Sequence, residues 1–144
     1  DLEQRLWLHG LNVDALRATD QYLPLDASPT LSKFMVNGWP HYGLFMDTIN
    51  ELFERARKNT RQVRAFGEMV ALLWSEGNSA ATVMLEHLWN AYCEKESFAL
   101  FCAYPKSEFP EDAATSLANI CKAHSKMITS WEKSSTELAY QDVE

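Results

Sequence analysis

Several patterns that would assign a function directly are missing from this chain of 144 residues. No apolar run approaches the roughly 20 residues that a helix needs to cross a bilayer, and the N-terminus has no signal-peptide pattern. The sequence also contains no G-x-x-x-x-G-K-[ST] phosphate loop, no G-x-G-x-x-G fingerprint and no G-x-S-x-G elbow. These absences argue against a membrane partner, a nucleotide cradle and a serine-hydrolase elbow, and they predict a cytoplasmic location.

Positive charge and cysteine are also scarce. The chain has 13 Lys and Arg against 20 Asp and Glu, which gives a formal net charge of -7. Nucleic-acid binding needs clustered cations, and the one basic run, Arg55, Arg57, Lys58, Arg61 and Arg64, is interrupted, so we expect no direct contact between this domain and DNA or RNA. Three cysteines are an odd count in a chain large enough to fold without disulfides, which predicts reduced thiols at Cys93, Cys102 and Cys121.

The composition that is present, 47% hydrophobic and 23% charged, is typical of one globular domain with a buried core. We place this domain at residues 1–130. Beyond Trp131 the chain becomes polar, which predicts a linker or connecting helix over 131–144.

Apolar spacing and capping residues predict the elements. Helical patterns cover 2–8, 11–16, 41–58, 68–76, 79–95 and 111–126. The first pattern stops near Gly10, and Gly77-Asn78-Ser79 ends the fourth pattern and caps the fifth. A further helix is expected to begin with Ser28 as N-cap and Pro29 in its first turn, to carry Met35, and to end at 37–40. Strands are expected at 21–26, as an edge strand because of Pro24, and at 62–66 and 98–103, as buried strands.

Alternating strands and helices predict an α/β fold with a mainly parallel sheet. Three strands are few for such a sheet, so we expect that strands precede Asp1 or that a partner chain completes it. Ligands of open α/β sheets lie at the carboxyl ends of the strands, which here are followed by Glu68 and by Cys102 to Tyr104.

Each candidate residue has a structural alternative. Glu68 could accept a proton, bind a cation or hold a ligand, or it could only stabilise the start of the next helix. Cys102 could be a nucleophile or a small core residue. Cys121 and His124 have a C-x-x-H spacing that, with Cys102 or Cys93, could bind a metal, or they could belong to a packing face.

Aromatic residues are the remaining candidates for a binding site. Such residues can line an apolar ligand pocket, although core packing explains most of them equally well. The set comprises Trp39, Phe66, Trp74, Trp89, Phe101 and Tyr104.

Several ordered blocks of the chain resemble one known family, the MEDS domains, the methanogen and methylotroph sensory domains of the DcmR regulator type. The resemblance runs from about Asp1 to Ile128. The blocks are Leu25-Asp26-Ala27, Phe34-Met35-Val36-Asn37-Gly38, Phe66 to Trp74, Glu76-Gly77-Asn78, Leu85-Glu86-x-x-Trp89-Asn90, Phe101 to Pro105 and Ile120-Cys121-x-x-His124-Ser125.

The resemblance implies a sensory input domain beside a histidine-kinase or DNA-binding output module, sensing small, hydrocarbon-derived molecules. The implied fold is similar to the RecA-like, three-layer α/β class without a working phosphate loop. Members usually begin with a strand, a helix and a strand before the segment at Leu2, so we expect the domain to be truncated at its N-terminus. The family's ligand contacts are not carried over to this sequence.

Three hypotheses follow from these observations. The first is a non-catalytic sensory domain with a ligand site at Phe66, Glu68, Trp74, Trp89, Cys102, Tyr104 and His124. The second is an enzyme that uses Cys102 or Glu68 with His124, whose side chains would then converge in a cleft. The third is a protein-interaction domain that forms a homodimer. The sequence identifies no cofactor.

Overall fold

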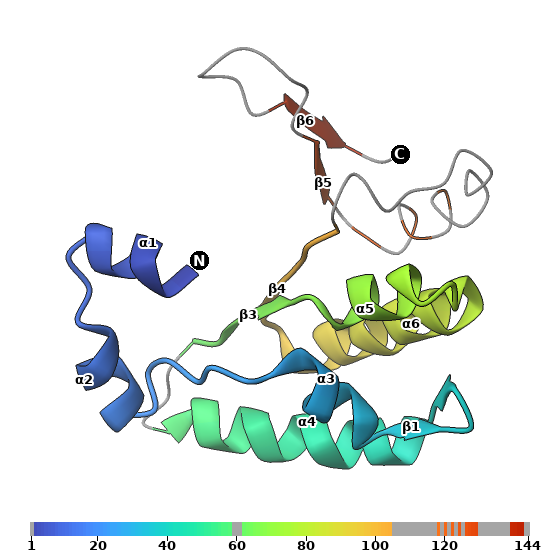
Figure 1. The fold of residues 1–144 in the computed structure, drawn as a ribbon, viewed down its shortest axis with the longest axis horizontal. Helices are drawn as coiled ribbons and strands as arrows, with labels where there is room; N and C mark the ends of the chain where they lie inside the picture. Colours follow the sequence, from blue (N-terminus) through green and yellow to red (C-terminus); the bar gives the residue numbers. More distant parts are fainter. Residues whose placement is uncertain are drawn as a thin grey trace. The chain divides into compact units, whose positions relative to one another are not determined.

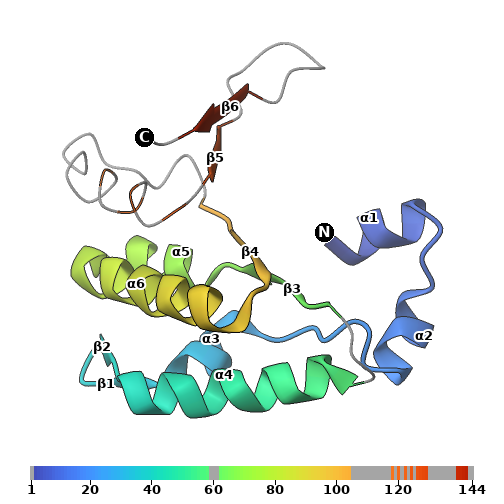
Figure 2. The same ribbon diagram turned by 180° about the vertical axis from the view of Figure 1, so that it is seen from behind.

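The computed structural model describes residues 2–58, 62–104, 118, 120, 122, 124, 126–129 and 139–142. The chain forms two compact units, one of residues 1–66 with 98–101 and the other of residues 67–97 with 102–144. Helices and small two-stranded sheets make up both units, so the fold is a mixture of α and β structure (Figures 1 and 2).

The first unit begins with two short helices, α1 (Leu2–Leu8) and α2 (Val13–Ala18), which confirm the predicted interruption near Gly10. Asn12 is the N-cap of α2, and its side chain accepts a hydrogen bond of 3.0 Å from the Ala15 N–H. An ion pair between Glu3 and Arg17 joins the two helices.

The predicted edge strand at 21–26 is wrong, because the structure has no strand there. The Gln21 and Tyr22 N–H groups donate to the Leu16 carbonyl at the end of α2, and Pro24 has no N–H for a ladder. Asp26, at the end of the segment, is the N-cap of α3 (Ala27–Ser32) and accepts from the Ser28 N–H at 3.2 Å. The predicted Ser28 cap is therefore wrong by two residues.

A hairpin follows α3 where we predicted helix and its end. Strands β1 (Met35–Val36) and β2 (Trp39–Pro40) are antiparallel, with Val36 opposite Trp39. Asn37 and Gly38 form the two-residue turn, and both have positive φ angles, 52° and 76°. This conformation is typical of Asn-Gly in a tight hairpin, which fixes the register and removes Met35 from the helix.

Helix α4 (Tyr42–Ala56) confirms the helix predicted over 41–58, and His41 is its N-cap. Phe45, Ile49 and Phe53 point to the core of the first unit, as their spacing predicts. The Phe45 ring meets the ring of Phe34 edge to face at 5.3 Å, and Phe53 meets Phe98 at 4.4 Å. These ring contacts, together with the buried side chains of Leu31 and Ile49, contribute to the core of this unit.

The end of α4 carries part of the basic run seen in the sequence. The Asp20 carboxylate pairs with Arg55 at 2.6 Å and with Lys58 at 3.0 Å. Hydrogen bonds from Arg55 and Lys58 hold the pKa of Asp20 below its ordinary value. Two cations of the run are thus committed to one carboxylate.

Strands β3 (Arg64–Gly67) and β4 (Ala99–Cys102) pair with each other, close to the predicted positions. They are not covered on both faces as predicted, because their residues alternate between exposed and half-buried. Phe66 and Phe101 are 52% and 51% exposed and stack on each other at 5.7 Å. The three-layer, mainly parallel sheet stays a prediction.

The second unit is built on α5 (Met69–Ser75) and α6 (Ser79–Glu96), which pack side by side (Figure 1). Gly77 has φ +76° between them, and the Gly77 and Asn78 N–H groups donate to the Trp74 and Leu73 carbonyls. This is a Schellman motif, which uses glycine for its left-handed position. Asn78 then caps α6 by accepting from the Ala81 N–H at 3.2 Å, as predicted.

The core of the second unit comes mainly from these two helices and from Ile120. Ala118, Ile120 and Lys122 are helical, in agreement with the predicted helix, but its predicted end at 126 is wrong, because His124 is not helical and Lys126 is a strand residue. The other residues of the predicted helix lie outside the described part of the chain. The buried apolar residues are Val70, Ala71, Leu73, Trp74, Ala81, Leu85, Leu88, Trp89, Tyr92 and Ile120.

The last described elements, β5 (Lys126–Thr129) and β6 (Ala139–Asp142), form an antiparallel hairpin. The domain boundary at 130 and the linker or connecting helix beyond it stay predictions. Among the described residues, no helix is both long enough and apolar enough to cross a membrane.

Candidate functional site

Glu86 is a buried carboxylate in the middle of α6. It is only 3% exposed, and Thr82 and Trp89, one turn before and after it, are buried as well. A carboxylate in such surroundings has lost most of its hydration and needs partners in the protein. Glu86 is therefore the natural centre of a site in the second unit.

Two of its partners come from the end of β4. The Ala103 N–H donates to the Gly67 carbonyl at 3.1 Å, which extends the backbone pairing beyond Cys102. Residues two apart in an extended chain face the same side, so Cys102 and Tyr104 both reach Glu86. The Tyr104 hydroxyl donates to Oε1, and the Cys102 Sγ lies 3.8 Å from Oε2.

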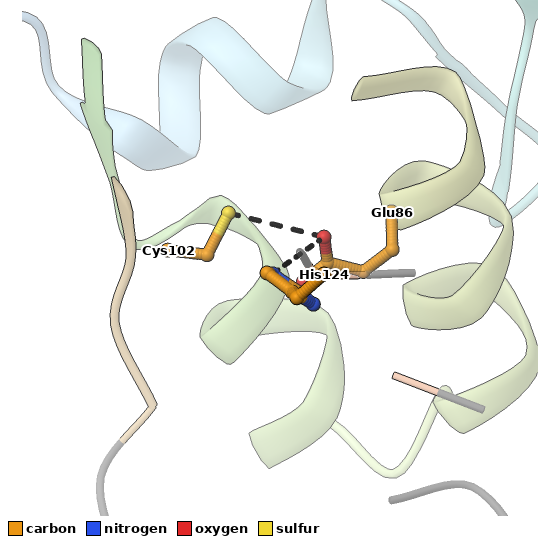
Figure 3. Close-up of side chains that lie close together, drawn as sticks. All are labelled: Glu86, Cys102 and His124. Atoms are coloured by element: carbon orange, nitrogen blue, oxygen red, sulfur yellow. Dashed lines mark hydrogen bonds and ion pairs between the residues drawn. The ribbon is translucent and has the colours of Figure 1, made fainter. Parts of the chain in front are cut away.

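His124 is the third partner and follows the helical residues 118–122. Its Nε2 lies 3.4 Å from Oε2 of Glu86 (Figure 3). Its Nδ1 lies 2.7 Å from the Ile120 carbonyl oxygen. A carbonyl oxygen only accepts, so Nδ1 carries a hydrogen, and Nε2 faces the carboxylate, with which it forms an ion pair when the ring is protonated.

Burial dominates the electrostatics of this cluster. It raises the pKa of Glu86, while the Tyr104 hydrogen bond and the charge of His124 oppose that rise. Burial and the neighbouring Glu86 charge raise the pKa of the Cys102 thiol, and the same two causes raise the pKa of Cys93 to about 11. Both thiols are free and favour the protonated form.

One set of donor atoms in the described part of the chain could hold a metal ion. Oε2 or Oε1 of Glu86, Sγ of Cys102 and a ring nitrogen of His124 all lie within 4.8 Å of one another. The set predicted from the sequence shares Cys102 and His124 with this group but not Cys93. Cys121 lies outside the described residues.

The structure thus brings three of the seven predicted site residues, Cys102, Tyr104 and His124, together around one carboxylate. Glu68 is exposed at the N-cap position of α5, makes no side-chain cap bond, and is not part of the cluster. The carboxylate that lies beside Cys102 and His124 is Glu86, not Glu68 as the enzyme hypothesis expected.

The three remaining predicted residues are aromatic. Trp74 and Trp89 lie in the core of the second unit, each 6% exposed. Phe66 belongs to the first unit. Ligand binding by any of the seven residues stays a prediction.

Glu86 was not among the predicted site residues, although a signal was available. Positions 82, 86, 89 and 93 follow one another at helical spacing, and Trp89 and Cys93 are residue types that are often buried. A carboxylate inside such a stripe is rarely left without a role, because its burial is costly.

Comparison with known families assigns the class of protein as a sensory domain. Residues 1–125 match the family described as MEDS, the methanogen/methylotroph, DcmR sensory domain. The chain belongs to the MEDS family, as its sequence blocks indicated. No curated protein and no solved structure matches the chain significantly.

Proposed function

We propose that this domain is the sensory input part of a prokaryotic signalling protein. It binds a small molecule and regulates an attached or partner output module, either a histidine kinase or a transcription regulator. Membership of a sensory family supports the general role. The single observation that carries the ligand site is the buried Glu86 carboxylate, on which Cys102, Tyr104 and His124 converge.

The cluster offers a physical route from ligand to signal. Its members come from α6, from the end of β4 and from the segment after Ile120. A molecule with a hydrogen-bond donor can replace the thiol or the imidazole at Oε2, which changes how these segments are held together. Such a molecule shifts the domain between states only if it binds one state better than the other.

A thermal-shift screen tests this proposal, with hits confirmed by calorimetry. The compounds are hydrocarbon derivatives such as small alcohols, amines and thiols, together with nucleotides. A true ligand at one hundred times its Kd stabilises the fold by about 2.7 kcal/mol. Glu86→Gln should abolish the shift, and Glu51→Gln, an exposed change on α4, should preserve it. No shift with any compound, or an equal shift in Glu86→Gln, contradicts the proposal.

We favour a non-catalytic role over a thiol enzyme. A nucleophilic cysteine needs a nearby cation or a helix N-terminus to stabilise its thiolate. A ring nitrogen of His124 lies within 4.8 Å of the Cys102 sulfur, but Cys102 also lies beside the buried Glu86 carboxylate, and both burial and that charge raise the pKa of its thiol. Cys102 is therefore better suited to recognise a ligand than to attack one.

We also propose four more specific properties of this domain. They are a RecA-like, three-layer arrangement, a homodimer, a cytoplasmic location and participation in a two-component system. The exposed stacked rings of Phe66 and Phe101 are compatible with a homodimer. Light scattering of the purified chain tests this point, and a strict monomer contradicts it.

A further inference from the structure

Two donor atoms, Nε2 of His124 and Sγ of Cys102, lie near Oε2 of Glu86 at distances close to those between the ligands of one metal ion. The imidazole Nε2 lies 3.4 Å from Oε2, and the Cys102 Sγ lies 3.8 Å from the same oxygen. Tetrahedral zinc, with its usual bond lengths, separates O from N by about 3.4 Å and S from O by about 3.6 Å. The three atoms all lie within 4.8 Å of one another, and the thiol must move closer to place them on one ion.

Neighbouring groups already orient two of the three ligands. The Ile120 carbonyl holds Nδ1 of His124 at 2.7 Å, which leaves Nε2 directed at the cluster. The Tyr104 hydroxyl holds Oε1 of Glu86, which leaves Oε2 for a metal. Hydrogen bonds of this kind fix the orientation of ligands in known metal sites and raise their affinity. In the close-up view, the Cys102 and His124 side chains both point to the Glu86 carboxylate (Figure 3).

We propose that Glu86, Cys102 and His124 form a binding site for a divalent transition-metal ion of the zinc class. A carboxylate, a thiolate and a neutral imidazole together carry two negative charges, which a divalent ion neutralises in this buried position. The mixed O, S and N set excludes Mg²⁺ and Ca²⁺, which prefer oxygen ligands alone. Three protein ligands leave the fourth tetrahedral position for an external ligand.

This inference goes beyond the proposed function, because the metal site needs no organic ligand. The two proposals also fail separately. If no metal binds, but an organic compound stabilises the metal-free protein and Glu86→Gln abolishes this effect, the metal proposal fails and the sensory proposal stands. A bound metal without any organic ligand leaves the metal site intact.

The test uses the full chain after treatment with a chelator. Zn²⁺ titration followed by calorimetry should give one site per chain. Co²⁺ should give visible d–d bands of tetrahedral geometry and a near-ultraviolet thiolate charge-transfer band. X-ray absorption of the zinc-loaded protein should show one sulfur and otherwise nitrogen or oxygen ligands.

Matched variants assign the site to its residues. Cys102→Ser should abolish the thiolate band, whereas Cys93→Ser should keep it, because Cys93 is half-buried on α6 but is not one of the three ligands. His124→Gln should weaken binding by more than about 100-fold, the upper limit for loss of an outer-shell group. His87→Gln, an exposed change beside Glu86, should leave the affinity unchanged.

Circular dichroism shows whether each variant is folded. X-ray absorption of the unmodified protein keeps the test decisive when a variant does not fold. The proposal is overturned by the absence of stoichiometric binding, by a metal without a sulfur ligand, or by a thiolate band that persists in folded Cys102→Ser.

Discussion

The Tyr104 hydroxyl donates a hydrogen bond to Oε1 of Glu86, and so joins the chain beyond β4 to the middle of α6. Glu86 is 3% exposed, so this oxygen has little access to water. A buried carboxylate that loses its donor keeps the full cost of its desolvation. The hydrogen bond therefore stabilises the folded state, and it also fixes the position of the Glu86 carboxylate beside Cys102 and His124.

Tyr104→Phe tests that bond with almost no change of shape. We expect the free energy of unfolding to fall by about 1 to 3 kcal/mol, because Oε1 is left without its donor. Chemical denaturation measures the difference. Tyr42→Phe is the control, since Tyr42 is exposed on α4 and its change should stay within about 0.5 kcal/mol. Equal effects of the two substitutions would show that Tyr104 does not hold Glu86.

Two adjacent residues of α4 test the core of the first unit. Phe45 is fully buried and packs edge to face on Phe34, whereas Leu44 is 39% exposed. Phe45→Ala should cost about 3 to 5 kcal/mol through lost burial and a cavity. Leu44→Ala should cost much less, and urea denaturation compares the two. Similar losses at both positions would contradict the assigned buried face.

Substitution of two glycines by alanine tests backbone strain alone, because neither position is crowded. A Cβ at either Gly67 or Gly77 would meet no heavy atom within 4 Å, but only Gly77 has a positive φ, +76°. Gly77→Ala should destabilise by about 1 kcal/mol or more, because it forces a left-handed alanine into the Schellman motif. Gly67→Ala should be neutral or slightly stabilising. A neutral Gly77→Ala in thermal denaturation would exclude the left-handed conformation at this position.

The Asp20 ion pairs make the free energy of unfolding depend on pH in the acid range. Arg55 and Lys58 hold its pKa below the ordinary value, so the folded state favours the ionised form. The contribution is complete above the pKa of the unfolded chain and is lost as the pH falls through the lowered folded pKa. Asn tolerates the left-handed backbone of residue 20, φ +52°, so Asp20→Asn removes mainly the charge.

We expect Asp20→Asn to be less stable than the unmodified chain near neutral pH, with a difference that shrinks in acid. Denaturation curves across that range measure it. Asp47→Asn, an exposed change on α4, serves as the control and should show no such trend. A difference that grows as the pH falls would have the wrong sign for this ion pair. High salt should reduce the difference, since the partners Arg55 and Lys58 are exposed.

Local signals predicted the helices well. Apolar spacing located α4, and Gly77 with Asn78 marked the junction of α5 and α6, because these features act within a few residues. The β1–β2 hairpin was missed although Asn37-Gly38 is a strong turn signal, since Trp39-Pro40 was interpreted as the end of a helix. At residues 21–26 the error is the opposite one: a strand was predicted where the structure has none. An apolar run forms a strand only if another strand pairs with it.

The candidate site was only partly predictable for a different reason. Cys102 and Tyr104 were chosen from their position after a strand, and His124 from its spacing to Cys121. Glu86 lies in the interior of a helix, and only the tertiary structure places it opposite these side chains. Convergence over 38 residues, from Glu86 to His124, depends on packing that no local pattern encodes.

A double-mutant cycle between Glu86 and His124 tests this convergence most directly. It compares the unfolding free energies of Glu86→Gln, His124→Gln, the double variant and the unmodified chain. Residues in contact should show a coupling of about 0.5 to 3 kcal/mol. The matched cycle of Glu51→Gln with His124→Gln should be additive. Additivity within about 0.5 kcal/mol for Glu86 and His124 would contradict the buried cluster as the site of this sensory domain.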